Sequence, residues 1–240
     1  MSSPVALLAF GAHPDDVELG CSGTLIKAVA NGKRVAVIDL TQGELGTRGD
    51  VPTRQKEAAA AASIMGLVAR ENLGFRDGFF TNDEQHQLAV IEKIRHYRPD
   101  VVLCNAETDR HIDHGRGAAL VANACFLSGL SKITTTHQGI PQQAWRPRYV
   151  FHYIQWNEVI PNFIVDISGY LEKKMEAVQA YSSQFYTPNS KEKSTPISSK
   201  NFLASVQYRA ENFGRLIGTA AGEGFTTKQP LAIDDINSWL

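Results

Sequence analysis

The sequence predicts an α/β fold: a Rossmann-like, doubly wound, mostly parallel sheet with helices on both faces and an elaborated C-terminal part. Two observations support this prediction. Over the first half of the chain, short runs that are apolar throughout alternate with longer helical patterns, which is typical of a parallel sheet covered on both faces. Two polar, histidine-bearing clusters directly follow two of these apolar runs, where such sheets bind their ligands.

The elements of the first half alternate regularly. Strands are predicted at Val5–Phe10, Arg34–Leu40, Asn72–Phe75 and Val101–Asn105. The helices that follow them are expected at about 22–31, 53–65, 82–97 and 114–127. Gly32 and Gly66 end the first two helices, Thr53 and Asn82 are the expected N-caps of the second and third, and Gln85 completes a capping box with Asn82.

Right-handed crossovers favour the strand order 3-2-1-4 for these elements. In that order the first and fourth strands are neighbours, and the chain leaves them in opposite directions. Their C-terminal ends then form a ligand-binding crevice, bordered by loops 11–18 and 105–114. Both histidine clusters are therefore predicted to lie at one edge of the sheet.

The second half is less regular. Residues 128–147 are expected to form a loop, and 187–199 a polar arm that contains two prolines. Strands are predicted at Tyr149–Ile154 and Phe163–Asp166, helices at about 169–180 and 200–217, and then a glycine-bearing tail. No repeat or linker divides the chain, so we expect one domain over residues 1–240.

Composition excludes several classes of function. The chain has 240 residues, a net charge of −1 and no basic run, so nucleic acid is not an expected partner. No apolar segment approaches the ~20 residues that span a bilayer, so no membrane insertion is expected. Three cysteines without CxxC spacing, Cys21, Cys104 and Cys125, indicate reduced thiols and a cytoplasmic protein.

The two clusters contain the residues of a metal site. We expect His13 and Asp16 from the first cluster and His114 from the second to bind one divalent cation. Two imidazoles and one carboxylate leave a coordination position open for water, the pattern of a catalytic zinc site. Asp15 is better placed to face that position and to take a proton from the water.

His111 is free for a second role if His114 is a ligand. It could stabilise an oxyanion or protonate a leaving amine, and Asp113 could fix its tautomer and raise its pKa. Each cluster alone also has an ordinary structural explanation, because loop histidines are often solvated and Asp-Asp after a strand often caps a helix. Their shared position at one predicted crevice favours a joint site.

Two arginines are candidates for substrate binding. The loop that contains Arg48 follows the second strand and so opens on the same edge of the sheet. Arg54 lies near a helix N-terminus, where a carboxylate or phosphate group would be stabilised. A solvated side chain is the alternative for both residues.

These motifs resemble the PIG-L/LmbE-like family of zinc-dependent deacetylases, which act on N-acetylglucosaminyl compounds. The family signature A-H-P-D-D-x-E is present as residues 12–18, and H-x-D-H as residues 111–114. Further matching segments are 43–49, Arg54, 57–58 and 181–185. The chain looks most similar to the branch that makes bacillithiol, the N-acetylglucosaminyl-malate deacetylases.

The resemblance implies roles for the same residues. His13, Asp16 and His114 would bind Zn²⁺, with Fe²⁺ as the alternative metal, and Asp15 would be the general base. His111, supported by Asp113, would be the oxyanion stabiliser or acid, and Arg54 would hold the malate carboxylates. This branch tends to form homo-oligomers, in particular hexamers, and the 187–199 arm would suit an interface. Where some relatives have a tyrosine, two residues before His111, this chain has Asp109.

The sequence therefore predicts hydrolytic deacetylation of an N-acetylglucosamine conjugate, releasing acetate and a free amine. Bacillithiol biosynthesis is the expected pathway, and another N-acetylglucosamine derivative is the alternative substrate. Two other classes remain open. A metallophosphoesterase would need more ligands than the two clusters offer, and a nucleotide-binding module is disfavoured because no GxGxxG follows the first strand.

Overall fold

The computed structural model describes residues 4–188, 190–232 and 235. Within these residues, seven strands form one sheet in the order β3-β2-β1-β4-β7-β9-β8, and β5 and β6 form a separate small hairpin. The strands are β1 Leu7–Gly11, β2 Val35–Thr41, β3 Ala69–Phe75, β4 Val101–Cys104, β5 Thr136–His137, β6 Ile140–Pro141, β7 Tyr149–Tyr153, β8 Phe163–Asp166 and β9 Gly222–Thr226. The predicted order 3-2-1-4 is confirmed.

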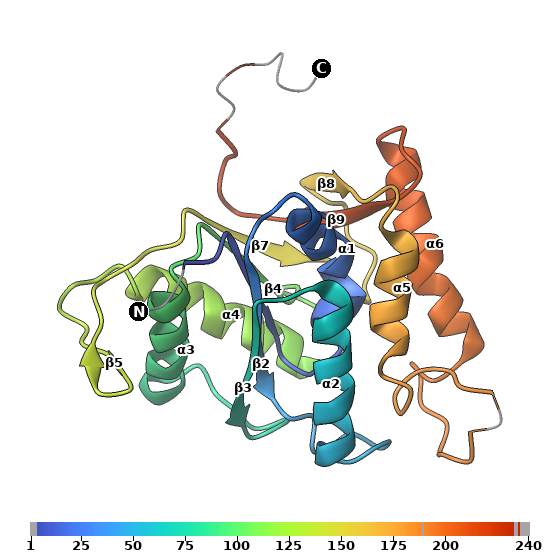
Figure 1. The fold of residues 1–240 in the computed structure, drawn as a ribbon, viewed down its shortest axis with the longest axis horizontal. Coiled ribbons are helices and arrows are strands. Elements are labelled where there is room, and N and C mark those ends of the chain that lie inside the picture. Colours follow the sequence, from blue (N-terminus) through green and yellow to red (C-terminus); the bar gives the residue numbers. More distant parts are fainter. Residues whose placement is uncertain (1–3, 189, 233–234, 236–240) are drawn as a thin grey trace.

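Six helices cover the sheet in the described residues. They are α1 Asp16–Ala30, α2 Val51–Met65, α3 Glu84–Tyr97, α4 Ile112–Leu127, α5 Leu171–Gln179 and α6 Lys200–Leu216. Helices α3 and α4 lie on one side of the sheet, and α1, α2, α5 and α6 lie on the other (Figure 1). The predicted doubly wound α/β fold is therefore confirmed.

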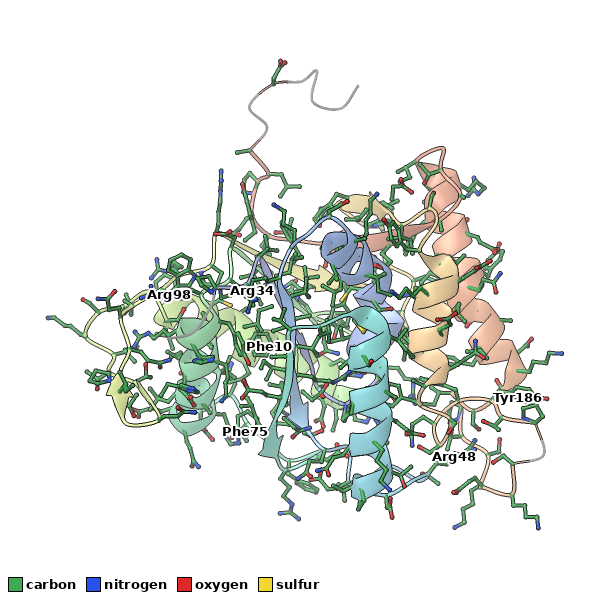
Figure 2. The ribbon with its side chains drawn as sticks, in the orientation of Figure 1. Phe10, Arg34, Arg48, Phe75, Arg98 and Tyr186 are labelled. Carbon is green, nitrogen blue, oxygen red and sulfur yellow. The ribbon has the colours of Figure 1, made fainter. Side chains whose placement is uncertain are left out.

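Alternation along the strands builds a core on each face. Leu8 and Phe10 of β1 point toward α3 and α4, and Phe10 lies in the middle of the structure (Figure 2). Ala9, between them, points to the opposite face and packs with Val17 and Leu25 of α1. Successive strand residues point to opposite faces, so an entirely apolar strand supplies both cores. Burial on both faces fixes the position of β1 in the sheet, and hence the position of the loop after it, which contains His13.

The C-terminal part extends this sheet. Strand β7 pairs in parallel with β4, whereas β9 pairs antiparallel with both β7 and β8. The prediction of a glycine-bearing tail missed β9. A Cβ atom on Gly222 would lie 2.5 Å from Ile164 Cγ2, so the strand needs glycine there and lacks the usual strand pattern.

Several helix starts differ from the prediction. Helix α1 begins at Asp16, six residues earlier than expected, and α4 begins at Ile112. Asp50 caps α2 by accepting a hydrogen bond from the Thr53 amide, and Asp83 caps α3. Both histidine clusters therefore lie at helix N-termini.

Two predictions from composition concern the described residues. None of the helices there is long and apolar enough to cross a bilayer. All three cysteines are buried and free. Asn189, within the predicted 187–199 arm, lies outside the described residues, as do both ends of the predicted 1–240 domain.

Candidate active site

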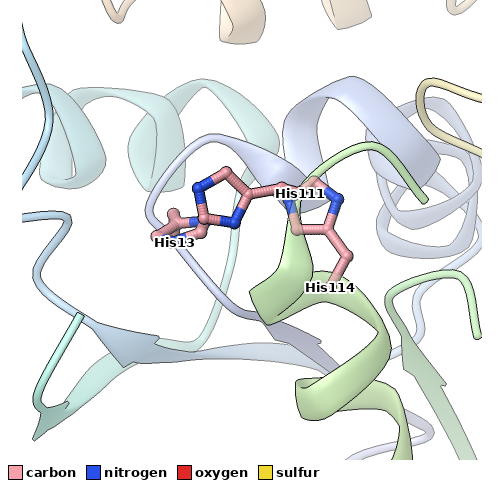
Figure 3. Close-up of side chains that lie close together, drawn as sticks. All are labelled: His13, His111 and His114. Atoms are coloured by element: carbon pink, nitrogen blue, oxygen red, sulfur yellow. The ribbon is translucent and has the colours of Figure 1, made fainter. Parts of the chain in front are cut away.

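A cavity of about 470 Å³ opens beyond the C-terminal ends of β1 and β4. Its lining includes His13, Asp15, Asp16, Arg54, His111 and His114. Side chains that are about 100 residues apart in sequence thus share one cavity, as the predicted strand order requires. Figure 3 shows the three histidine rings gathered at the start of α4.

Local backbone structure aims the first cluster. Asp15 is the N-cap of α1 and has a φ angle of 117°, a left-handed conformation that is unusual for a residue other than glycine. The Asp16 carboxylate accepts a hydrogen bond from the His13 amide at 2.9 Å. Adjacent Asp15 and Asp16 therefore point in different directions, which allows different roles for them.

The second cluster caps α4. His111 is the N-cap, and its Nδ1 accepts a hydrogen bond from the Asp113 amide at 3.3 Å. His114 is in the first turn, one helical turn from the cap. Both helix N-termini thus face the cavity, where their dipoles favour negative charge.

Asp16 lies between two imidazoles. Its Oδ2 atom is 3.5 Å from His13 Nδ1, and its Oδ1 atom is 3.2 Å from His114 Nε2. The rings of His13 and His114 have centroids 5.8 Å apart. The three predicted metal ligands are therefore close together, each with a ligand atom toward the others.

An outer carboxylate contacts the far nitrogen of each of these imidazoles. Asp77 Oδ1 is 3.0 Å from His13 Nε2, and Asp109 Oδ2 is 2.7 Å from His114 Nδ1. A neutral imidazole that donates its proton to the outer carboxylate keeps a lone pair on its other nitrogen. That other nitrogen faces Asp16 in both histidines, so both rings are oriented for a shared ligand.

Two amide side chains hold Asp16 in place. Asn105 Nδ2 donates to Oδ2 at 3.0 Å, and Gln155 Nε2 donates to Oδ1 at 2.6 Å. Asn105 itself is anchored by the Ala12 amide, which donates to its Oδ1 at 2.9 Å. All of these groups are buried, so the carboxylate has one orientation.

The electrostatics of the site follow from burial and pairing. Burial alone would lower the pKa of His13, but hydrogen bonds to Asp113, Asp16 and Asp77 raise it well above its usual value. Burial also opposes protonation of His114, but Asp16 and Asp109 raise its pKa to about 9. Burial would raise the pKa of Asp16, but His114 and His13 lower it well below its usual value. Both imidazoles therefore hold a proton more strongly than a free histidine does.

These residues fit a divalent cation. Among the described residues, His13, His111 and His114 have ligand-type atoms within 4.8 Å of one another, and so do His13, Asp77 and Asp113. Asp16 is in neither group, but its carboxylate oxygens lie 3.5 Å from His13 Nδ1 and 3.2 Å from His114 Nε2. Buried carboxylates at the site outnumber its arginines, so a cation would compensate negative charge. Two imidazoles with a carboxylate are the donors that zinc or ferrous iron uses.

Asp15 is a separate feature of the cavity. Burial raises its pKa to about 7, while Arg54 acts in the opposite direction. Arg54 Nη2 lies 3.2 Å from Asp15 Oδ2 and also donates to the Pro14 carbonyl oxygen. A carboxylate with a pKa near neutrality, at the wall of the cavity, suits a general base.

Asp113 acts on the pKa of His111 in the predicted direction but does not decide it. Burial and the charges of His13 and His114 lower the pKa of His111, although Asp113 acts to raise it. The Asp113 carboxylate accepts from the Gly78 amide at 2.8 Å and from Arg116 at 2.7 Å, and its Oδ2 atom lies 3.4 Å from His13 Nε2. His111 is therefore held mainly by the backbone of its own helix cap.

Arg48 does not line the cavity. It is buried, and its Nη2 donates to Ser190 Oγ at 2.8 Å. Figure 2 labels Arg48 in the region of the loop that carries Tyr186. Of the two predicted substrate-binding arginines, Arg54 faces the cavity and Arg48 fastens the 187–199 arm.

Sequence reasoning missed four residues of the site. Asp77, Asn105, Asp109 and Gln155 each follow a strand, β3, β4 or β7, at the same edge of the sheet. This position after a strand is the sequence feature that could have indicated all four residues. Asp109, where the family resemblance led us to look for a tyrosine, contacts His114 Nδ1.

Comparisons with known proteins identify the family of this chain. Residues 8–125 match the PIG-L family model, described as GlcNAc-PI de-N-acetylase. A conserved protein of Thermus thermophilus has a solved structure that is 33% identical, with a TM-score of 0.85 over 97% of this chain and 98% of that one. The chain belongs to the PIG-L family.

Curated relatives of this PIG-L protein include deacetylases. The diacetylchitobiose deacetylase of Thermococcus kodakarensis is 29% identical over 75% of this chain and 70% of its own length. A probable N-acetyl-alpha-D-glucosaminyl L-malate deacetylase 2 of Bacillus anthracis is 27% identical over 73% and 79%. The chain is thus a member of an enzyme family of hydrolytic N-deacetylases.

Proposed function

We propose that this PIG-L protein is a zinc-dependent deacetylase of an N-acetylglucosamine conjugate. Water adds to the acetyl carbonyl carbon, the C–N bond breaks, and acetate and a free amine leave. One observation carries the proposal: Asp16 lies between two imidazoles, each oriented by an outer carboxylate, beside Asp15 and His111. The family match and the deacetylase relatives support it.

We assign the metal to three residues. His13, Asp16 and His114 would hold Zn²⁺, or Fe²⁺ as the alternative. When bound, the cation supplies Lewis acidity to the attacking water and to the acetyl carbonyl.

The remaining roles belong to side chains around the cavity. Asp15 takes a proton from the attacking water, because its raised pKa matches that task near neutral pH. His111, whose lowered pKa favours the neutral ring, donates a hydrogen bond to the developing oxyanion. In the alternative role it would pass a proton to the leaving amine, which requires the imidazolium form. Arg54 orients Asp15 and presents a positive group to the substrate, and Asp113 holds the first turn of α4.

Replacement of Asp15 tests the mechanism. We expect Asp15→Asn to lower kcat for acetate release by about 10²- to 10⁴-fold, the usual contribution of a general base. The zinc content should stay unchanged, because Asp15 is not an assigned ligand. Turnover near the wild-type level with zinc bound would show that another group removes the proton.

For the substrate, we propose N-acetylglucosaminyl-malate and a place in bacillithiol biosynthesis. The Bacillus anthracis relative and the position of Arg54 in the cavity support this choice. Another N-acetylglucosamine derivative is the alternative, supported by the Thermococcus kodakarensis relative. A panel of malate, inositol, phosphatidylinositol and chitobiose conjugates separates them, and we expect the highest kcat/KM for the malate conjugate.

We also propose that residues 1–240 act as one domain in a cytoplasmic homo-oligomer, specifically a hexamer. Three buried free cysteines suit a reducing compartment. Exposed apolar side chains at the cavity mouth, Leu45 and Ile112, are available to a second copy. Light scattering coupled to size-exclusion chromatography measures the assembly, and a monomeric mass would contradict it.

A further inference from the structure

One carboxylate contacts both the proposed metal centre and the substrate side of the cavity. Asp77 follows β3 and is buried, with 5% of its surface exposed. Its Oδ1 atom is 3.0 Å from His13 Nε2, while its Oδ2 atom accepts a hydrogen bond from the Leu45 amide at 3.0 Å. The Asp77 amide in turn donates to Glu44 Oε1 at 2.7 Å. The two carboxylate oxygens of Asp77 therefore serve two different parts of the site.

The partner segment is loop 43–49, between β2 and α2. Leu45 lines the cavity although 61% of its surface is exposed. Gly43 lies against Arg54: a Cβ atom on Gly43 would be 3.3 Å from the guanidinium carbon of Arg54. The loop thus forms a wall of the cavity next to Arg54, and Asp77 receives a hydrogen bond from its middle.

We propose that Asp77 couples occupancy of the metal centre to the order of loop 43–49. The inference rests on the proposed metal site and extends it to substrate positioning. A cation on His13 Nδ1 fixes the imidazole, the ring fixes Asp77 through Nε2, and Asp77 fixes the Leu45 amide. Asp77 is thus a positioning residue for both His13 and the loop.

Coupling of this kind is reciprocal. If the cation orders the loop, then loosening the loop must weaken binding of the cation by the same factor. Asp109 offers a matched comparison, because it orients His114 in the same way but has no contact with loop 43–49 among the described residues.

Amide hydrogen exchange on the full chain, with and without zinc, tests the proposal. In the wild type we expect zinc to slow exchange of the Leu45 amide about tenfold or more. In zinc-loaded Asp77→Ala this protection should be lost, and the zinc Kd should rise about 10- to 100-fold. In zinc-loaded Asp109→Asn the Kd should also rise, but Leu45 should stay protected.

A variant at the exposed Glu44 tests the reverse direction without touching the core. Glu44→Ala removes the acceptor of the Asp77 amide and should raise the zinc Kd several-fold. Glu44→Gln removes the same charge but keeps an acceptor, so its Kd should stay near the wild-type value. Equal effects of the two substitutions would mean that charge alone acts, which overturns the coupling.

The remaining outcomes separate this inference from the proposed function. Zinc bound at His13 without protection of Leu45, or protection that persists in Asp77→Ala, overturns the coupling and leaves the deacetylase proposal standing. Loss of Leu45 protection in zinc-loaded Asp109→Asn also overturns it, because the effect would then be general. Absence of zinc binding to the wild type overturns both.

Discussion

The imidazoles of His13 and His114 have equivalent surroundings. In each ring one nitrogen faces Asp16 and the other faces outer carboxylates, Asp77 and Asp113 for His13 and Asp109 for His114. Such outer carboxylates fix the tautomer of a metal-binding histidine and raise its basicity. At the scale of residues, the site is a carboxylate between two oriented imidazoles.

Metal binding should release protons. Hydrogen bonds and nearby carboxylates raise the pKa of His13 well above its usual value and that of His114 to about 9, despite burial. Both rings are therefore protonated at pH 7 in the metal-free protein, and a cation must displace about two protons. The apparent affinity should rise with pH and level off once the pH exceeds both pKa values.

Calorimetry in buffers of different ionisation enthalpy counts these protons. We expect about two released per zinc at pH 7, and fewer as the pH approaches 9. Release of none at pH 7 would mean that the two histidines are neutral before binding, contrary to their carboxylate surroundings.

Asp109 should contribute to metal affinity. Asp109→Asn keeps the size of the side chain but removes the charge that accepts the His114 proton, so we expect zinc affinity to fall about 10- to 100-fold. Competition with a chromogenic chelator measures the change. An unchanged affinity would assign Asp109 to capping of the Arg110 and Asn157 amides alone.

At the scale of elements, a buried ion pair joins three of them behind the site. Lys174 of α5 donates to Glu223 of β9 at 2.6 Å and to the carbonyl oxygen of Leu19 in α1 at 2.9 Å. Glu223 also accepts hydrogen bonds from the amides of Gly23 and Thr24. The pair ties the C-terminal strand to the helix that presents Asp16.

Removing one partner of the Lys174–Glu223 ion pair should destabilise the folded protein. Lys174→Met leaves the Glu223 carboxylate buried without its cation, and we expect the free energy of unfolding to fall by about 3–5 kcal/mol. Urea denaturation measures this loss. The double variant Lys174→Met/Glu223→Gln should recover part of it, and a double variant less stable than the single one would contradict this explanation.

Sequence periodicity predicts the regular elements of this fold but not its C-terminal sheet. Strands β1, β2 and β4 are mainly apolar because both faces are covered, so their pattern is readable although Asp39 interrupts β2. Strand β9 has only one large apolar residue, Phe225, because Gly222 packs against Ile164 and Glu223 pairs with Lys174. Contacts of this kind, with segments distant in sequence, produce no local sequence pattern from which the strand could be predicted.

The same distinction holds for the site. His13, Asp16 and His114 could be predicted because their motifs are compact and follow readable strands. Asp77 and Gln155 are isolated polar residues whose roles depend on which loops face each other across the cavity. The arrangement of Asp113, which bonds to Gly78 and Arg116 rather than supporting His111, depends likewise on the packing of the loop after β3.

At the scale of the whole molecule, the proposed cation would link two segments from opposite ends of the N-terminal half of the chain. His13 precedes α1, His114 begins α4, and an ion held by both binds only the folded chain. Zinc at 100 times its Kd should therefore raise the free energy of unfolding by about 2.7 kcal/mol, and Tm by about 5–10 °C. Differential scanning calorimetry with zinc and with chelator measures the shift, and equal Tm values would exclude a site built from these two segments.

The central claim is that one cation, held by His13, Asp16 and His114, is needed for deacetylation by this chain. The most direct measurement is acetate release and metal content on the same preparations of wild-type, metal-stripped and His114→Ala protein. We expect one zinc or iron per wild-type chain, turnover proportional to occupancy, and loss of both in His114→Ala. Full turnover by the metal-stripped protein, or by His114→Ala without bound metal, would contradict the account.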